Sequence, residues 1–382
     1  MDRRSFLKFS GKGILLLGGM SMMSACSGVK REDLPRLNGE KTSLKGLEKD
    51  EMEILYLASL APSGHNTQPW TVKIVEPKHW VIGSDKKRWL TTVDPDNREL
   101  LLGMGAFIEN LVLAAGIFGY EADVQIIAKN ASDLDIADIR LRKGKTIEFP
   151  LEKIKKRRTV RSGYTDQVIK TEDLKYITKH DSKSCTLPHA PSPHSFYYPN
   201  NSPQGKYLQE GTIEANRKQA FRDPAQEELA NWIRWSNKEA KQYRNGLTPE
   251  SMEIKGIAGL FVRNFYNRQS VLKKSFRDQT VDIVAKQVNT CGGWLVVNSS
   301  DSNIPTLIEY GKVFENMLLR IRERMIAIHP MTQMLEEEPW KKQIAKELGL
   351  AGDVQWILRI GYLKSYPDPV SLRMPVPWFV KT

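Results

Sequence analysis

Cysteine is scarce in this chain: among its 382 residues there are three, Cys26, Cys185 and Cys291. So few cysteines exclude a disulfide framework and a thiolate metal site, and we predict no metal centre. We interpret Cys185 and Cys291 as two separate thiols, although an oxidising compartment would also allow them to pair. The sequence also lacks His-Glu-x-x-His, Gly-x-Ser-x-Gly, a Walker loop and a Gly-x-Gly-x-x-Gly after a strand. It therefore carries none of the main signals for a zinc peptidase, a serine hydrolase or a P-loop enzyme.

The apolar run near the N-terminus is too short for a permanent membrane helix. It covers Gly13–Ala25, whereas a spanning helix needs about 20 apolar residues. The run follows the pair Arg3-Arg4 and precedes Met23-Ser24-Ala25-Cys26, an order typical of a twin-arginine export signal with an approximate lipobox. We expect residues 1–26 to be this signal and the mature protein to be periplasmic or on the outer face of the membrane. A lipid on Cys26, simple cleavage and an uncleaved anchor remain open alternatives.

Acidic residues are in the minority, with 57 Lys and Arg against 45 Asp and Glu and a formal net charge of +12. A basic surface can meet nucleic acid, anionic lipid or an anionic ligand. Export argues against nucleic acid, so we expect no such partner and membrane contact only through the signal or a lipid. The chain is long enough for one large domain or two modest ones.

A nine-residue pattern occurs twice, as GAFIENLVL at Gly105–Leu113 and as GKVFENMLL at Gly311–Leu319. Both copies lie in helical patterns, the second predicted to run through Met325 to His329-Pro330. Coincidence between two amphipathic helices is the alternative. We interpret the repeat as a duplication, with an N-terminal half at 47–150 and a C-terminal half at 151–382. A helical cap is predicted to be inserted at about 205–290.

The pattern of apolar residues predicts a mixture of helices and strands. Leu47–Leu60 is predicted to be helical, and a further helix is expected to begin near Thr171, with Thr171 as its N-cap. Strands are predicted at Thr71–Val75, Ile136–Arg142, Trp294–Asn298 and Val354–Tyr362.

The segment Ala61–Trp70, APSGHNTQPW, joins the first predicted helix to the first predicted strand. Its Pro, Gly and Asn residues favour a sharp bend, on which Ser63, His65, Asn66 and Gln68 can converge on one ligand. A planar heterocycle with several acceptors would suit such a site. An ordinary connecting loop is the other interpretation.

The densest basic run is KIKKRRTVR at Lys153–Arg161. Alternate residues of an extended segment point the same way, so Arg157, Thr159 and Arg161 can share one face. Two guanidinium groups and a hydroxyl suit a phosphate. A solvated cluster of charges is the alternative.

Taken together, these strings resemble the FMN-dependent nitroreductase family. APSGHNTQPW resembles the loop that contacts the flavin, RRTVR resembles the Arg-x-Ser/Thr-x-Arg/Lys opening element, and GYLKSYPDPVSLRMP resembles the closing Gly-Tyr and Arg-x-Pro. The resemblance implies that FMN is the cofactor, with Arg373 reaching its phosphate. The residues it assigns to cofactor binding are Pro62, Ser63, His65, Asn66, Gln68, Arg157, Arg158, Thr159, Arg161 and Arg373.

The order of these elements resembles the fused, tandem Acg-type subfamily. The loop lies in the first half, both arginine elements lie in the second, and Ala190–His194 is only a degraded echo of the loop. The resemblance implies an α+β nitroreductase fold, in which two fused halves form a pseudo-dimer with mixed central sheets flanked by helices. It further implies a monomer with one complete flavin site and one lost site. Met374 and the basic turn Arg320–Arg324 depart from the family pattern, which puts substrate access in doubt.

The function that this resemblance implies is an exported FMN oxidoreductase. It would reduce nitro, quinone or related electrophilic small molecules in a ping-pong cycle, with NAD(P)H, a quinol or a redox partner as donor. Flavin N5 would carry the chemistry without a catalytic side chain, and His65 is a candidate donor or a structural hydrogen-bonding residue. One alternative is a flavin-sequestering binding protein with little turnover, closed by a cap built from Asn231–Phe276. Another is a surface lipoprotein that has lost the cofactor.

Overall fold

The computed structural model of the chain describes residues 28–36, 46–179, 194–254 and 256–381. The predicted signal at 1–26, with Cys26, lies outside the described residues. So do Cys185 and most of the echo at Ala190–His194. Within the described part, Cys291 is a buried free thiol.

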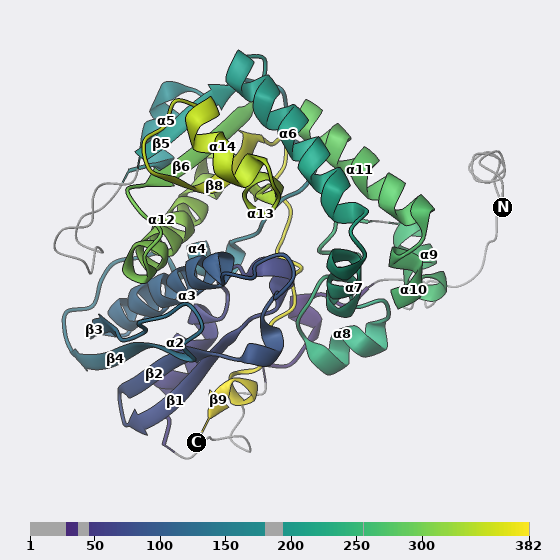
Figure 1. The fold of residues 1–382 in the computed structure, drawn as a ribbon. Helices are drawn as coiled ribbons and strands as arrows, with labels where there is room; N and C mark the ends of the chain where they lie inside the picture. Colours follow the sequence, from purple (N-terminus) through teal and green to yellow (C-terminus); the bar gives the residue numbers. More distant parts are fainter. Residues whose placement is uncertain (1–27, 37–45, 180–193, 255, 382) are drawn as a thin grey trace.

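Five strands form the first sheet, in the order β3-β4-β2-β1-β9 (Figure 1). β1 (Trp70–Glu76) and β2 (His79–Ser84) form a hairpin, and β4 (Asp135–Lys143) and β3 (Tyr120–Ile126) continue it in antiparallel fashion. β9 (Val380–Lys381) comes from the far end of the chain and pairs in parallel with β1. The strands predicted at Thr71–Val75 and Ile136–Arg142 are confirmed.

Four antiparallel strands form the second sheet, in the order β5-β6-β8-β7. They are β5 (His194–Pro199), β6 (Gly293–Ser299), β8 (Asp353–Tyr362) and β7 (Ile326–Pro330). The prediction that the second repeated helix continues to His329-Pro330 was wrong for its last part. That helix ends at Ile321, and Met325 then adopts a left-handed backbone that turns the chain into β7. A short buried apolar run such as Ile326–Ile328 cannot be assigned to helix or strand from periodicity alone.

The two copies of the repeated pattern lie in α3 (Arg98–Ile117) and α12 (Ile304–Ile321), which pack against each other between the sheets (Figure 1). Their glycines meet at the crossing. A Cβ on Gly105 would lie 2.0 Å from the carbonyl oxygen of Ile308, and a Cβ on Gly311 would lie 2.0 Å from that of Leu102. Glycine at these two positions therefore sets how closely the helices approach.

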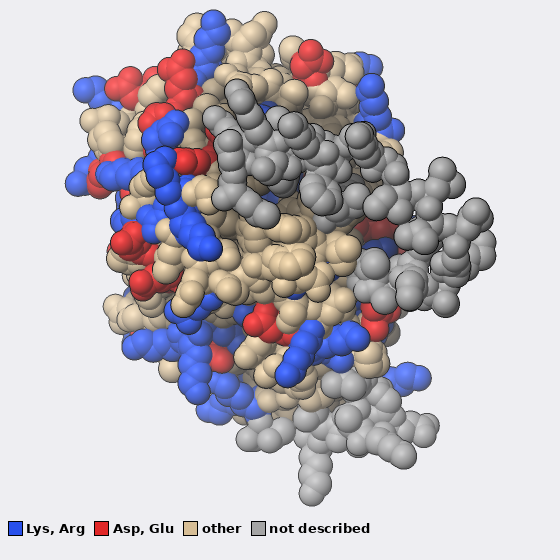
Figure 2. All heavy atoms as spheres, turned by 90° about the vertical axis from the view of Figure 1, so that its right-hand side faces the viewer, with Lys and Arg blue, Asp and Glu red and all other residues tan. Residues whose placement is uncertain are grey.

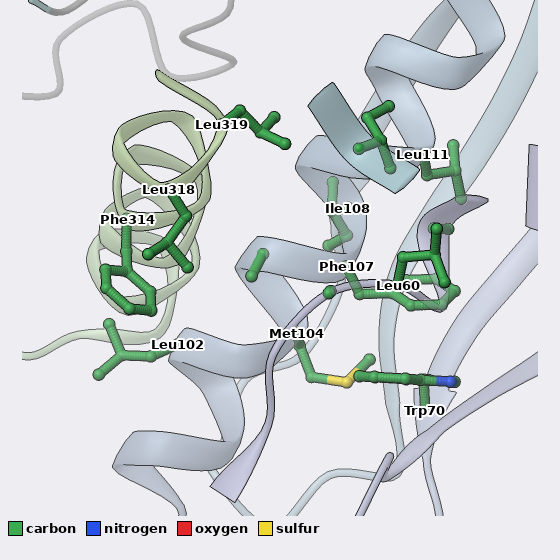
Figure 3. Packing of buried hydrophobic residues seen from close by; sticks show 14 of the residues in the cluster. Leu60, Trp70, Leu102, Met104, Phe107, Ile108, Leu111, Phe314, Leu318 and Leu319 are labelled. Carbon is green, nitrogen blue, oxygen red and sulfur yellow. The ribbon is translucent and has the colours of Figure 1, made fainter. Parts of the chain in front are cut away.

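Apolar side chains of both helices fill the space around this crossing (Figure 3). The ring of Phe107 on α3 stacks on Trp70 of β1 with centroids 5.0 Å apart. Residues of β8 and Phe379, near the C-terminus, belong to the same core cluster. The predicted halves therefore share one continuous core. Among the described residues, α3 has the length and apolar composition of a membrane span, but it is mostly buried within the protein.

Shorter helices surround the sheets. α2 (Lys49–Ala58) confirms the helix predicted at Leu47–Leu60. α5 (Thr171–Ile177) begins where expected, but its N-cap is Lys170 and not Thr171. α4 covers Leu151–Lys156, α13 covers Gln333–Glu336 and α14 covers Trp340–Glu347.

The predicted insertion at about 205–290 contains a series of helices. α6 (Pro203–Ala220) and α11 (Lys274–Asn289) lie side by side (Figure 1). Shorter helices connect them and build a small core of their own around Trp235 and Val271. These connecting helices are α7 (Asp223–Trp232), α8 (Asn237–Tyr243), α9 (Gly256–Phe265) and α10 (Arg268–Val271).

Basic side chains are unevenly placed on the face that carries these helices. Figure 2 shows Lys and Arg gathered towards one side and the lower edge of this face, while the described part of its centre is mainly uncharged. The excess of positive charge at this face therefore lies towards its margin.

Candidate functional site

The loop after α2 has an unusual backbone. Within four residues, His65, Asn66 and Gln68 all adopt left-handed conformations, with φ of 45°, 54° and 52°. Side chains other than glycine rarely adopt this region, and such strain is concentrated at functional sites. Trp70, fully buried against Phe107, holds the end of the loop in the core.

The amide side chains of this loop bind the backbone of distant segments. Asn66 Nδ2 donates to the carbonyl oxygens of Gly246 at 3.0 Å and of Leu372 at 3.2 Å. Gln68 Nε2 donates to Arg244 O at 3.0 Å and to Leu372 O at 3.3 Å, and its Oε1 accepts from the Met374 amide at 2.9 Å. Both amides, predicted to face a ligand, therefore tie the loop to residues 244–246 and 372–374.

Pro62 and Ser63 form the other edge of the loop and are both half-buried. Ser63 Oγ accepts a hydrogen bond from the backbone N–H of Gln68 at 3.0 Å, which closes the bend. A Cβ on Gly103 of α3 would lie 3.6 Å from Pro62 O. The small residue on α3 therefore allows the loop to lie close to the helix.

Arg157 and Arg373 meet at the start of the same loop. Both guanidiniums donate to the carbonyl oxygen of Leu60, Arg157 at 3.1 and 3.0 Å and Arg373 at 3.0 Å. Arg373 also donates to Ala61 O at 3.0 Å and to Asn66 Oδ1 at 2.9 Å. The basic run, the closing segment and the 61–70 loop are thus brought together at one place.

Glu315 of α12 is the carboxylate beside these two arginines. Its Oε1 lies 3.5 Å from Arg157 Nε, and its side chain is fully buried. Burial raises the pKa of Glu315 to about 7, against the opposing effect of Arg157. The pKa of Arg373 is lowered well below its ordinary value, first by burial and then by the neighbouring charges of Arg157 and Arg31.

The remainder of the basic run faces a different partner. Arg158 Nη2 donates to Glu253 Oε1 at 3.0 Å, and so does the backbone amide of Arg161 at 3.1 Å. Arg161 Nη1 lies 2.6 Å from His329 Nε2, an arrangement that requires a neutral imidazole accepting the bond. Thr159, between these arginines, is half-buried. Arg157 and Arg158 thus serve different partners, as expected for successive residues of an extended segment.

His65 lies at the edge of this cluster. The residue is half-buried, and its Nδ1 is buried without a hydrogen-bond partner. Burial and the charge of Arg161 lower the pKa of His65 to about 4, against the opposing charge of Glu99. Burial together with Arg161 and Arg359 likewise lowers the pKa of His329. Both imidazoles are therefore neutral at pH 7.

The cluster has more guanidinium groups than carboxylates. In the described part of the chain, Glu253 and Glu315 are the carboxylates that form ion pairs with it. Several buried guanidinium nitrogens have no hydrogen-bond partner, and they are Arg157 Nη1, Arg158 Nε, Arg359 Nε and Arg373 Nε. Buried, partly unsatisfied cations favour an anionic ligand. Because they leave buried guanidinium nitrogens without partners, the arginines of this cluster fit the phosphate of FMN.

A small cavity borders the loop, and a second lies near the start of α3. A cavity of about 10 Å³ is lined by Ser63, Gly64 and Glu99, and another of about 140 Å³ lies between Asp94, Arg222 and Glu336. Pockets that bury a drug-sized ligand usually measure about 300–1,000 Å³. Neither of these two cavities is large enough to hold a flavin ring.

Four residues of the cluster, Glu253, Glu315, His329 and Arg359, were not assigned from the sequence. Glu315 belongs to the repeated Glu-Asn pair and could have been found through it. His329 was considered only as the expected end of the second repeated helix. Glu253 lies in a turn, and no local sequence pattern distinguishes it.

No protein-family model matches this chain. An NAD(P)H nitroreductase of Mycobacterium tuberculosis, so named provisionally, is 39% identical over 71 residues, which cover 19% of this chain and 20% of that protein. The Acg nitroreductase of the same organism, also provisionally named, is 37% identical over 83 residues, 22% of this chain and 25% of the relative. The matched segments thus span about a fifth to a quarter of these relatives. A nitroreductase-like family protein from Bacillus cereus aligns in structure with a TM-score of 0.33 and 14% identity, over 63% of this chain and 98% of that one.

Proposed function

We propose that this protein is an FMN-dependent oxidoreductase of the nitroreductase family that reduces nitro, quinone or related electrophilic small molecules. The observation that carries the proposal is the meeting of Arg157 and Arg373 at the Leu60 carbonyl, beside the strained 61–70 loop. These elements are far apart in the sequence, and together they offer partly unsatisfied cationic donors. The similarity to NAD(P)H nitroreductases over a fifth of the chain supports the same function.

Arg157 and Arg373 are the residues that would hold the phosphate of FMN. Each keeps one buried nitrogen without a partner, Arg157 Nη1 and Arg373 Nε, that can donate to a phosphate oxygen. Glu315 beside Arg157 would be driven towards its neutral form by a phosphate dianion, because its pKa is already raised to about 7. The cluster would therefore keep the positive charge that an anionic cofactor requires.

The loop residues Pro62–Gln68 and the nearby Arg161 would contact the flavin ring. When bound, the flavin supplies hydride and electron transfer, so the side chains need only bind, orient and exclude water. His65 is neutral at pH 7 and can act there as a hydrogen-bond donor, but not as an imidazolium acid. We therefore assign no catalytic side chain.

The donor and location are part of the same proposal. NAD(P)H appears in the names of the relatives. The Arg3-Arg4 pair and Cys26 instead suggest export, where a quinol or a redox partner would replace it. Fractionation of native cells decides between a cytoplasmic protein that uses NAD(P)H and an exported protein that uses another donor. Full-length protein in the cytoplasm would rule out the exported form.

Flavin content and reduction test the function directly. We expect about one FMN per purified chain, reduced by dithionite and by NAD(P)H under anaerobic conditions. Reduction by dithionite alone would favour a sequestered flavin or another donor, and a chain that binds no FMN would refute the proposal.

Two arginine variants test the assigned site. Arg373→Gln should lose FMN. Arg277→Gln, which alters a buried arginine of α11 that pairs with Asp223 of α7, should retain it. Full FMN content in both variants would show that Arg373 does not hold the cofactor.

A further inference from the structure

Glu253 is held unusually tightly for a residue outside any helix or strand. Its carboxylate accepts from Arg158 Nη2 at 3.0 Å and from the Arg161 amide at 3.1 Å, and the hydroxyl of Ser162 donates to its other oxygen. The Glu253 and Arg158 side chains are only 4% and 6% exposed. A guanidinium, a backbone amide and a hydroxyl around one anion are the donors that a phosphate group uses.

The turn that carries Glu253 has little else to hold it against the basic run. Arg161 Nε donates to Ser251 O at 3.2 Å. The amides of Met252, Glu253 and Ile254 bond within the turn, to the carbonyls of Thr248, Glu250 and Pro249. Glu253 itself has a left-handed backbone, with φ of 63°. Such a conformation persists when surrounding contacts impose it, and here the bonds to the Arg158–Ser162 stretch are those contacts.

The charge around Glu253 is incompletely balanced. Arg359 Nη2 donates to the carbonyl oxygen of Arg161 at 2.7 Å, while Arg359 Nε and Arg158 Nε are buried without partners. His329, which faces Arg161, is neutral. One carboxylate therefore faces several buried cations, and a dianion would compensate them better than Glu253 does.

We propose that Arg158, the Arg161 amide and Ser162 form a phosphate-binding seat that Glu253 occupies as an internal competitor. A phosphate group displaces Glu253 and releases the turn at 248–254. Arg158 and Ser162 bond Glu253, whereas Arg157 bonds Leu60 O, so the seat is distinct from the Arg157–Arg373 pair. The proposed function enters only in naming one source of the phosphate, FMN or another phosphate-bearing ligand, beside free inorganic phosphate.

Inorganic phosphate is the first probe. If Glu253 fills the seat in about nine of ten molecules, the apparent Kd for phosphate is about tenfold weaker than that of the open seat. Glu253→Gln should therefore bind phosphate about tenfold more tightly than the natural protein, by calorimetry or by thermal stabilisation. The control is Glu337→Gln, which changes a buried carboxylate paired with Arg222, outside the basic run. Equal phosphate affinity in the natural protein and Glu253→Gln would overturn the proposal.

Comparison of FMN with riboflavin identifies the source of the phosphate. If the FMN phosphate uses the seat, Glu253→Gln tightens the binding of FMN and leaves that of riboflavin unchanged. If free phosphate is the ligand, the affinity for inorganic phosphate rises while both flavins bind as before. A chain that binds no flavin but keeps the phosphate effect would refute the proposed function and leave the seat standing.

Hydrogen exchange tests the natural protein, so the result does not depend on the folding of a variant. The amides of Met252, Glu253 and Ile254 are the reporters, because their bonds lie within the turn. We expect them to exchange faster in phosphate than in chloride of equal ionic strength. Unchanged exchange at a phosphate concentration that saturates binding would contradict displacement of Glu253.

Discussion

Glu109 is a carboxylate placed where its charge is costly. It lies on α3 at the crossing with α12, fully buried, and its Oε1 accepts from Asn316 Nδ2 at 2.8 Å. Lys312 Nζ lies 4.0 Å from its other oxygen and is itself 3.2 Å from Glu309. Burial raises the pKa of Glu109 to about 7 in spite of Lys312 and Asn316.

This raised pKa makes stability depend on pH. The folded state holds the proton up to about pH 7, whereas the unfolded chain releases it near its ordinary value of 4.5. The contribution of Glu109 to the free energy of unfolding is therefore fully present below pH 4.5. It is lost as the pH rises through 7. Between pH 5 and pH 8 the loss amounts to about 2–3 kcal/mol, because each tenfold change in a proton-binding constant corresponds to about 1.4 kcal/mol.

The variant Glu109→Gln removes this titration but keeps an acceptor for Asn316. We expect its unfolding free energy, relative to the natural protein, to rise by about 2–3 kcal/mol between pH 5 and pH 8. Urea unfolding at the two pH values measures the difference. Glu152→Gln, at an exposed carboxylate, should show no such trend. A relative stability that is the same at both pH values would show that Glu109 is ionised in the fold and refute the reasoning.

Three further predictions follow from individual contacts. Gly311→Ala should lower stability by about 2 kcal/mol, because the added Cβ would lie 2.0 Å from Leu102 O and overpacking outweighs the gain in helix propensity; an unchanged Tm would contradict the close helix crossing. Arg373→Lys should weaken FMN binding at least tenfold, because a lysine cannot reproduce the fork of bonds to Leu60, Ala61 and Asn66. Full FMN affinity in that variant, measured by equilibrium dialysis, would show that charge alone is enough. His65→Gln should leave the pH profile of FMN binding unchanged between pH 6 and 8, since burial lowers the pKa of His65 to about 4; loss of a titration in this range would show that His65 becomes protonated there.

The sequence predicted the central elements of the fold because they have strong local patterns. The repeated GxxxEN strings identify α3 and α12, and alternating or continuous apolar runs identify β1, β4, β6 and β8. β9 has no such pattern: it consists of two residues and exists because Val380 and Lys381 reach the edge of β1. β7 was assigned to a helix, since a buried edge strand of five residues has no distinctive period.

The sequence predicted which residues belong to the candidate site, but it did not predict their hydrogen-bond partners. Arg157, Arg373 and Asn66 belong to ordered strings, and the structure brings all three to one place. Their hydrogen bonds to the carbonyls of Leu60 and Leu372 depend on how distant segments fold together. The approach of Glu253 to Arg158 is of the same kind, because the residues are far apart and neither lies in a periodic element.

The two repeated helices differ at the positions where a cofactor loop would approach. Gly103 on α3 leaves room for Pro62 and Ser63. Its counterpart on α12 is Glu309, which forms a buried ion pair with Lys312 at 3.2 Å. A buried ion pair is costly to break, so a loop cannot easily lie there. We therefore predict about one FMN per chain, measured by absorbance after denaturation, and a value near two would show that the second half retains a site of its own.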